Sequence, residues 1–176
     1  MATEITTKIT TGEVTFCYVN LLKPTAMKEG DALKYNVAIV IPKSDTKTID
    51  KIKAAIQAAT DAGIATLGGK VPAKLAIPLR DGDTDRPDDA AFAGCVFVNA
   101  KSTNPPGIVD ANLEPIIDPN EIYSGMIGRA SINFYAYNQA GSKGIAAGLN
   151  NVQKLKAGTR LSGGSTPEDD FSDPLM

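Results

Sequence analysis

A long alternating segment followed by a turn constrains the fold of this chain more than any other feature. From Ile127 to Tyr137, small apolar residues alternate with polar and aromatic residues, a period of two that is typical of a half-buried β-strand. Asn138 to Gly144 is rich in turn-forming residues, and Ile145 to Leu155 supplies a second strand. The two segments therefore predict a β-hairpin. The inner face of its first strand is predicted to consist of Ala130, Ile132, Phe134 and Ala136.

Three earlier segments also have the pattern of core strands. Residues 9–22 alternate, and they are predicted to place Val14, Phe16 and Tyr18 on one face. Residues 33–41 alternate in the same way, with one face predicted to carry Leu33, Tyr35, Val37, Ile39 and Ile41 and the other Lys34, Asn36, Ala38 and Val40. Residues 94–102 also alternate, so that successive side chains are predicted to lie on opposite faces of one strand. One face carries Val96, Val98 and Ala100, and the other carries Phe97, Asn99 and Lys101.

One substantial helix is expected between the second and third of these strands. Apolar residues recur at helical spacing after Pro42, Ser44 or Asp45 can cap the helix, and Gly63 can end it. Many hairpins and few helices argue against a parallel α/β sheet. The sequence predicts a mainly β protein of OB-fold type, a small closed or partly open β-barrel with a helix across its mouth.

The charged residues divide the chain into two parts. Residues 161–176 contain four acidic residues and no basic residue, so residues 1–160 have a net charge of +2 and the whole chain has −2. Most of the other residues at the end of the chain are Gly, Ser, Thr and Pro, a composition that cannot form a core. We expect one domain over residues 1–158 and a disordered acidic tail over residues 159–176. The tail residues of interest are Glu168, Asp169, Asp170, Phe171 and Asp173.

The composition argues against most enzyme classes. The chain has no histidine, which removes the commonest general base and the commonest zinc ligand. Leu67 to Lys70 lacks the spacing of a phosphate-binding P-loop, and no cofactor is expected. Cys17 and Cys95 lie in apolar runs and are predicted to be reduced core thiols. With no membrane-length apolar stretch and no secretory signal, we expect a soluble protein in the cytoplasm, that of the host cell if a phage encodes it.

An acidic cluster invites a metal-binding interpretation. Asp81, Asp83 and Asp85 have the spacing of the first calcium-loop ligands, but the twelfth position is Phe92 rather than Glu. Aspartates that cap turns explain the segment better. Arg80, just before them, is a candidate contact to a phosphate group.

The outer face of residues 127–137 is both polar and aromatic, which suits a nucleic-acid surface. Tyrosine rings stack on bases of any identity, and Arg and Lys bind the phosphates. The alternative is that these rings pack under the helix or in a dimer interface, and the formation of a homodimer stays open. The predicted DNA-binding residues are Arg80, Phe97, Asn99, Lys101, Arg129, Asn133, Tyr135, Tyr137, Lys143 and Lys154.

Several segments together resemble a family of phage-encoded single-stranded-DNA-binding replication proteins. They are Ile41 to Thr46 (IPKSDT), Pro78 to Asp83 (PLRDGD), Tyr123 to Gly125 (YSG), Gly128 to Tyr137 (GRASINFYAY) and Gly144 to Leu155. The resemblance covers the chain from about Lys8 to Asp170.

The resemblance implies an OB-fold and sequence-tolerant binding of single-stranded DNA in phage replication or recombination, without catalysis. It also implies an acidic tail that competes with DNA and recruits replication or recombination partners. Here Phe171 is followed by five more residues, unlike bacterial proteins of this class, which end on an aromatic. Two alternatives stay open: a β-barrel protein of the virion that serves assembly, and a metal-dependent nuclease using Asp81, Asp83 and Asp85.

Overall fold

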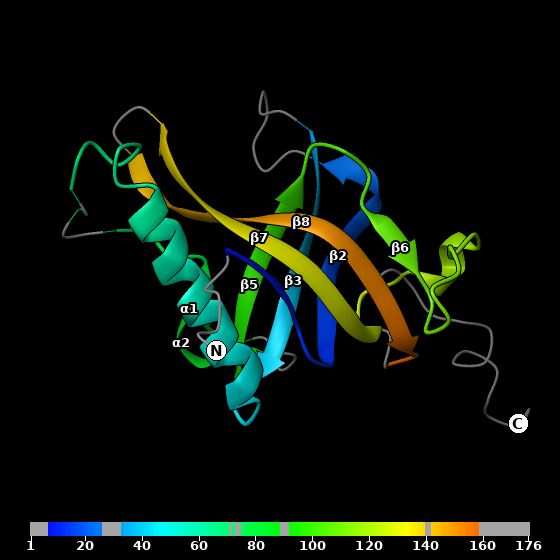
Figure 1. Ribbon diagram of the computed structural model, residues 1–176. Coiled ribbons are helices and arrows are strands. Elements are labelled where there is room, and N and C mark those ends of the chain that lie inside the picture. The colour runs from blue at the N-terminus through cyan, green and yellow to red at the C-terminus, as the bar shows by residue number, and fades with distance from the viewer. Residues whose placement is uncertain are drawn as a thin grey trace, which may run out of the picture.

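Five long strands form a closed barrel in the computed structural model, which describes residues 7–25, 33–70, 72, 75–88, 92–139 and 142–158 (Figure 1). Alternating apolar residues in each strand supply the inner face, as the sequence predicted. The barrel strands are β2 (Val14–Thr25), β3 (Lys34–Pro42), β5 (Cys95–Ser102), β7 (Ile127–Gln139) and β8 (Ser142–Lys156).

The strand order of the barrel is that of an OB-fold. β2 pairs with β3, β3 with β5, and β7 with both β8 and β2, all antiparallel. β5 and β8 run parallel and pair only at Ala100 with Ala147 and at Lys101 with Gly148. The barrel is therefore closed by a short parallel seam between its third and fifth strands. This confirms the predicted mainly β, OB-like fold.

The inner faces of the strands build one hydrophobic core. Phe16, Ile39, Val98, Ile132 and Phe134 are at most 1% exposed and belong to it. The predicted inward faces of 94–102 and 127–137 are therefore confirmed. In residues 33–41 the prediction holds for Val37, Ile39 and Ile41 but is wrong for Leu33, which is 59% exposed. In residues 9–22 the prediction holds for Val14 and Phe16 but is wrong for Tyr18, which is 52% exposed. The pairing of β2 with β3 shifts register after Cys17, and this bulge turns the next side chain to the outside.

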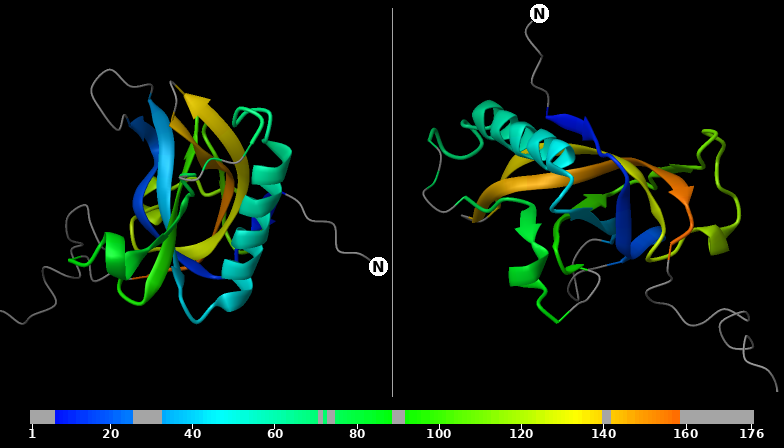
Figure 2. Two further views of the ribbon diagram at one scale, coloured as in Figure 1. Left: turned by 90° about the vertical axis from the view of Figure 1, so that its left-hand side faces the viewer. Right: turned by 90° about the horizontal axis from the view of Figure 1, so that it is seen from below.

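Helix α1 (Thr46–Ala62) covers part of the barrel, as predicted. Asp45 caps it by accepting a hydrogen bond from the Thr48 amide (3.2 Å), and the helix ends at Gly63. Its apolar face, which includes Ile49, Ile52 and Ile56, packs into the main core beside β7 (Figure 2). A Cβ at Gly63 would overlap Ala136, so the glycine allows the helix end to approach β7 closely.

Short elements complete the described part of the chain. β1 (Lys8–Thr10) pairs with β7, β6 (Gly107–Val109) pairs with β8, and a 3-10 turn, η2, spans Pro119–Glu121. The sequence did not predict β4 (Leu79–Asp81) or the single-turn helix α2 (Gly82–Asp85), which follow each other along the edge of β5. Over the residues described, no helix has the length and hydropathy to cross a membrane.

Candidate nucleic-acid interface

A groove of about 440 Å³ lies on the outside of the barrel, where β3, β5, β7 and β8 come together. The strands present alternate side chains to it, because the neighbouring positions point into the core. Ala76, Ile77 and Pro78 form one wall, and Ile145, Ala146 and Ala147 lie on the β8 side. The polar and aromatic lining residues are Lys34, Arg80, Asn99, Lys101, Tyr135 and Tyr137.

The two tyrosines are accommodated by small residues on the paired strand. Tyr135 pairs with Ala146 and Tyr137 with Gly144 across the hairpin. A Cβ added at Gly148 would lie 3.5 Å from the Tyr135 ring, so that ring lies directly over the β8 backbone. A Cβ at Gly144 would come within 2.7 Å of the Tyr137 hydroxyl, which leaves no room for a side chain there. Tyr135 remains 45% exposed, so part of its ring surface faces solvent.

The wall formed by Ala76, Ile77 and Pro78 is attached to β8 by backbone hydrogen bonds. The Ile145 amide donates to the Ala76 carbonyl (2.8 Å), and the Ala76 amide donates to the Lys143 carbonyl (3.4 Å). Ile77, next to this attachment, is 47% exposed and lines the groove. The groove therefore combines aliphatic and aromatic lining residues.

The charge of the groove is positive. Lys34, Arg80 and Lys101 line it, and none of its lining residues within the described ranges is acidic. Arg80 has one weak partner, Asp85, at 3.7 Å, and both side chains are more than one-third exposed. Such an exposed pair contributes little and leaves Arg80 able to contact an anion. Aromatic rings beside exposed or weakly paired cations suit a chain of bases joined by phosphates.

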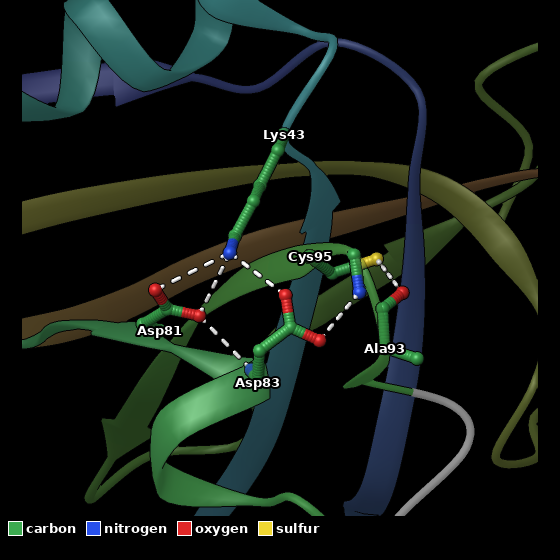
Figure 3. Close-up of polar contacts among 6 residues, drawn as sticks. Lys43, Asp81, Asp83, Ala93 and Cys95 are labelled. Atoms are coloured by element: carbon green, nitrogen blue, oxygen red, sulfur yellow. Dashed lines mark hydrogen bonds and ion pairs between the residues drawn. The ribbon is translucent and has the colours of Figure 1, made fainter.

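The acidic cluster next to the groove is an anchor for β4 and α2. Lys43 Nζ lies 3.0 Å from Asp81 Oδ1 and 2.8 Å from Asp83 Oδ2 (Figure 3). Asp81 also accepts from the Asp83 amide, and Asp83 accepts from the Gly94 amide, each at 2.9 Å. The hydrogen bonds from Lys43 lower the pKa of both carboxyl groups. The carboxylates are thus held by a lysine and by turns, as the capping interpretation predicted, which ties the ends of β3, β4 and β5 together.

Five of the ten predicted contact residues lie together in the groove. They are Arg80, Asn99, Lys101, Tyr135 and Tyr137. Lys143 lies beside it, half-buried, and its Nζ is near Gly68. The sequence reasoning missed Lys34, although the alternation of residues 33–41 already placed it on the outer face.

The premise that Phe97 is exposed is wrong. Phe97 shares the outer face with Asn99 and Lys101, but it is 1% exposed. It packs edge-to-face with Phe92 (4.9 Å between ring centroids) and belongs to a second, smaller hydrophobic cluster on the outside of the barrel. The segment that precedes β5 folds back over it, which strand alternation alone does not indicate.

Three other predicted residues lie away from the groove. Arg129 Nε donates to the Thr11 carbonyl (3.2 Å), and Asn133 accepts from the Thr7 hydroxyl (2.9 Å). β1 pairs with β7 along this stretch, where Asn133 is half-buried and Arg129 remains exposed. Lys154 is paired with Glu121 (2.8 Å) and lies 5.0 Å from the Tyr123 ring centroid, with a side chain that is only 10% exposed.

The two cysteines are both thiols. Cys17 is buried, as predicted, and Cys95 is partly exposed. Burial raises the pKa of the Cys95 thiol, and the charge of Asp83 raises it further. A thiol of raised pKa is a poor nucleophile, so this arrangement favours a packing role for Cys95.

Comparisons with known proteins identify a family and a fold that match this chain. The family model of the single-stranded-DNA-binding protein of Enterobacter phage Enc34 matches residues 7–175. Protein p50 of Acyrthosiphon pisum secondary endosymbiont phage 1 is 31% identical over 180 residues, which cover 96% of this chain and 95% of the relative.

Solved structures have the same fold. The single-stranded-DNA-binding protein of bacteriophage Enc34, in complex with single-stranded DNA, superposes with a TM-score of 0.79 and 25% identity, covering 89% of this chain and 90% of that chain. The single-stranded-DNA-binding protein gp2.5 of bacteriophage T7 has a TM-score of 0.62 at 19% identity, with 96% and 94% covered, a likeness of fold alone.

Proposed function

Because this chain belongs to the family of the single-stranded-DNA-binding protein of Enterobacter phage Enc34, we propose that it binds single-stranded DNA with little sequence preference. In this proposal it coats and protects exposed strands during phage replication or recombination, in the cytoplasm of the host. It acts by binding and not by catalysis.

The groove is the observation that carries the proposal. In OB-folds, nucleic acids bind to the face of the second and third strands and to the loops between the first and second and the fourth and fifth strands. Lys34 lies on the second barrel strand, Asn99 and Lys101 on the third, and the tyrosines on the fourth. The part of the groove on the second and third strands therefore overlaps the general ligand face of the fold, which supports the proposal.

The lining residues suggest how a strand is held. Bases stack on Tyr135 and Tyr137, and stacking is insensitive to base identity because every base has an aromatic face. Lys34, Arg80 and Lys101 contact the phosphates, which supply the larger, salt-dependent part of the affinity. Asn99 adds a hydrogen-bonding group between them. This division of roles supports sequence-tolerant binding.

Binding to oligo-dT at several salt concentrations tests the proposal. Three phosphate contacts to a single strand predict a slope of log K against log salt of about −2, from about −0.7 per contact. Fluorescence anisotropy of a labelled oligonucleotide measures it. No shift at micromolar protein and low salt would refute the proposal. Cleavage of DNA that needs a divalent ion and is lost in Asp83→Ala would instead favour a nuclease.

The acidic tail is part of the proposal. Residues 159–176 lie outside the described residues, but the family match extends to residue 175. We propose that the tail, with its four acids around Phe171, competes with DNA for the basic groove or recruits replication proteins. Truncation after Ser165 is then expected to tighten binding at low salt, and equal or weaker binding would show that the tail is not a competitor.

A further inference from the structure

A second aromatic site lies outside the groove, where Tyr18 leaves the regular path of β2. Its φ is 49°, in the left-handed region that side chains other than glycine rarely adopt. Tyr18 is also 52% exposed, so burial of its ring does not explain this conformation. A strained residue persists only where its surroundings hold it, and such residues gather at ligand sites.

The surroundings of Tyr18 do hold its backbone. On one side the Gly125 amide donates to the Phe16 carbonyl (2.7 Å), and on the other the Val19 amide donates to the Ser124 hydroxyl (3.0 Å). The Asn20 side chain donates to the Tyr18 carbonyl (3.2 Å). The bulge is therefore fixed by contacts on both sides of Tyr18, and its exposed ring is presented from a rigid backbone.

An aromatic and cationic cluster surrounds the Tyr18 ring. The ring stacks on Phe92 with centroids 6.0 Å apart and an interplanar angle of 25°. The Arg86 guanidinium carbon lies 5.8 Å from the ring centroids of both Tyr18 and Phe97. Buried Phe92 and Phe97 thus support an exposed tyrosine and an exposed arginine. This is the same pair of chemistries, ring and cation, that lines the groove.

The cluster and the groove share one face of the sheet. Cys17 pairs with Ala38, and Ala38 pairs with Asn99, which lines the groove. Two strand spacings separate the first and last of these residues, or about 10 Å. Arg80 of the groove pairs with Phe97, the ring that Arg86 also contacts. A single strand of DNA that leaves the groove and crosses β5 and β3 would therefore reach Tyr18 next.

We propose that Tyr18 and Arg86 form a second nucleotide subsite, which binds a further base and phosphate of the same DNA strand that occupies the groove. This inference rests on the proposed function. The base stacks on the exposed part of the Tyr18 ring, and Arg86 binds the adjoining phosphate. The ligand is a single-stranded nucleic acid longer than the groove can hold.

Oligonucleotide length separates this subsite from the groove. Anisotropy is measured with oligo-dT of about 4 and about 16 nucleotides, the range that single OB-folds cover. Tyr18→Gly removes the ring and suits the positive φ, so it relieves strain rather than adding it. It is expected to weaken binding of the long oligonucleotide at least about 5-fold and to leave the short one unchanged. Tyr18→Phe keeps the ring and should bind both as the unmodified protein does.

The outcomes distinguish the two proposals. If the unmodified protein binds neither oligonucleotide, the proposed function fails. If it binds both and folded Tyr18→Gly binds both equally well, or loses affinity for both by the same factor, the second subsite is refuted. Photocrosslinking of the unmodified protein to a long oligonucleotide containing 5-iododeoxyuridine needs no variant. Crosslinks are expected on the peptide that contains Tyr18, and their confinement to the peptides of the groove would refute the subsite.

Discussion

Replacing Tyr135 with alanine tests the groove most directly. One side of the ring lies over the backbone of β8 at Gly148, and the residue is 45% exposed. Only the side facing the groove is available, so Tyr135 can stack on one base. Loss of one stacked base costs about 1–3 kcal/mol, which weakens binding by about 5- to 140-fold. Tyr137 is less exposed and its hydroxyl is confined near Gly144, so the same change there should cost less.

The assay is a titration of labelled oligo-dT followed by anisotropy at one fixed salt concentration. Tyr135→Phe keeps the ring and should bind within about 2-fold of the unmodified protein. Ile117→Ala is a matched control, because Ile117 is 91% exposed and does not line the groove. A thermal melt of each variant confirms folding, since truncating a half-exposed side chain should change stability little.

One result would refute the reasoning. If Tyr135→Ala is folded and its Kd for oligo-dT equals that of the unmodified protein, the ring does not stack on a base. The groove would then bind DNA through its cations alone. A different outcome, in which Tyr135→Phe and Tyr135→Ala lose the same affinity, would point to the hydroxyl instead of the ring.

Three further predictions follow from single contacts. Lys101→Gln should flatten the slope of log K against log salt by about 0.7, measured by anisotropy, because it removes one phosphate contact; an unchanged slope would place Lys101 outside the DNA path. Gly128→Ala should lower stability by about 1–3 kcal/mol in a urea melt, because its Cβ would overlap the Gln153 carbonyl, whereas Gly148→Ala meets only ordinary contacts and should be near neutral. Lys43→Met should lower the Tm at pH 7, and the Tm difference between the variant and the unmodified protein should be smaller at pH 3. Lys43 holds the pKa values of Asp81 and Asp83 below their ordinary values, so the stability they contribute is complete above about pH 4 and is lost as the pH falls through the lowered values. The same Tm difference at both pH values would contradict this coupling.

The barrel strands of this protein could be predicted from the sequence because each of them turns alternate apolar residues toward the main core. The structure places most of the predicted faces of residues 33–41, 94–102 and 127–137 inward, although Leu33 is 59% exposed and Ala38 and Val40, on the other face of residues 33–41, are buried in the second cluster. In residues 9–22 the alternation fails at Tyr18, because a β-bulge turns this side chain to the opposite face. No local sequence pattern indicates this bulge. β4 and α2 were missed for a related reason, since a three-residue strand and one helical turn are too short to show a period.

The sequence predicts the site correctly only where outward-facing residues are not covered by another segment of the chain. Alternation correctly assigns Phe97, Asn99 and Lys101 to one face, yet Phe92 and the turn before β5 cover the first of them. Asn133, on the same face of β7, is half-buried and hydrogen-bonded to Thr7, while Tyr135 two residues further on is 45% exposed. Which part of an outer face stays uncovered depends on segments distant in sequence. Strand periodicity carries no information about them.

The alternation of β7 also explains why binding and stability can be varied separately in this protein. Ile132 and Phe134 are fully buried in the core, whereas Tyr135 and Tyr137 on the opposite face line the groove. A change at a tyrosine therefore removes contact surface for DNA without opening a cavity, and a change at Phe134 does the reverse. The coupling that remains runs through the backbone of β8, because Gly144 sets how closely the Tyr137 ring approaches the sheet. A larger side chain at Gly144 has the Ala76 carbonyl on one side and the Tyr137 hydroxyl on the other, so it must displace either the groove wall or the ring. Glycine at this position is thus a requirement of the site as much as of the barrel.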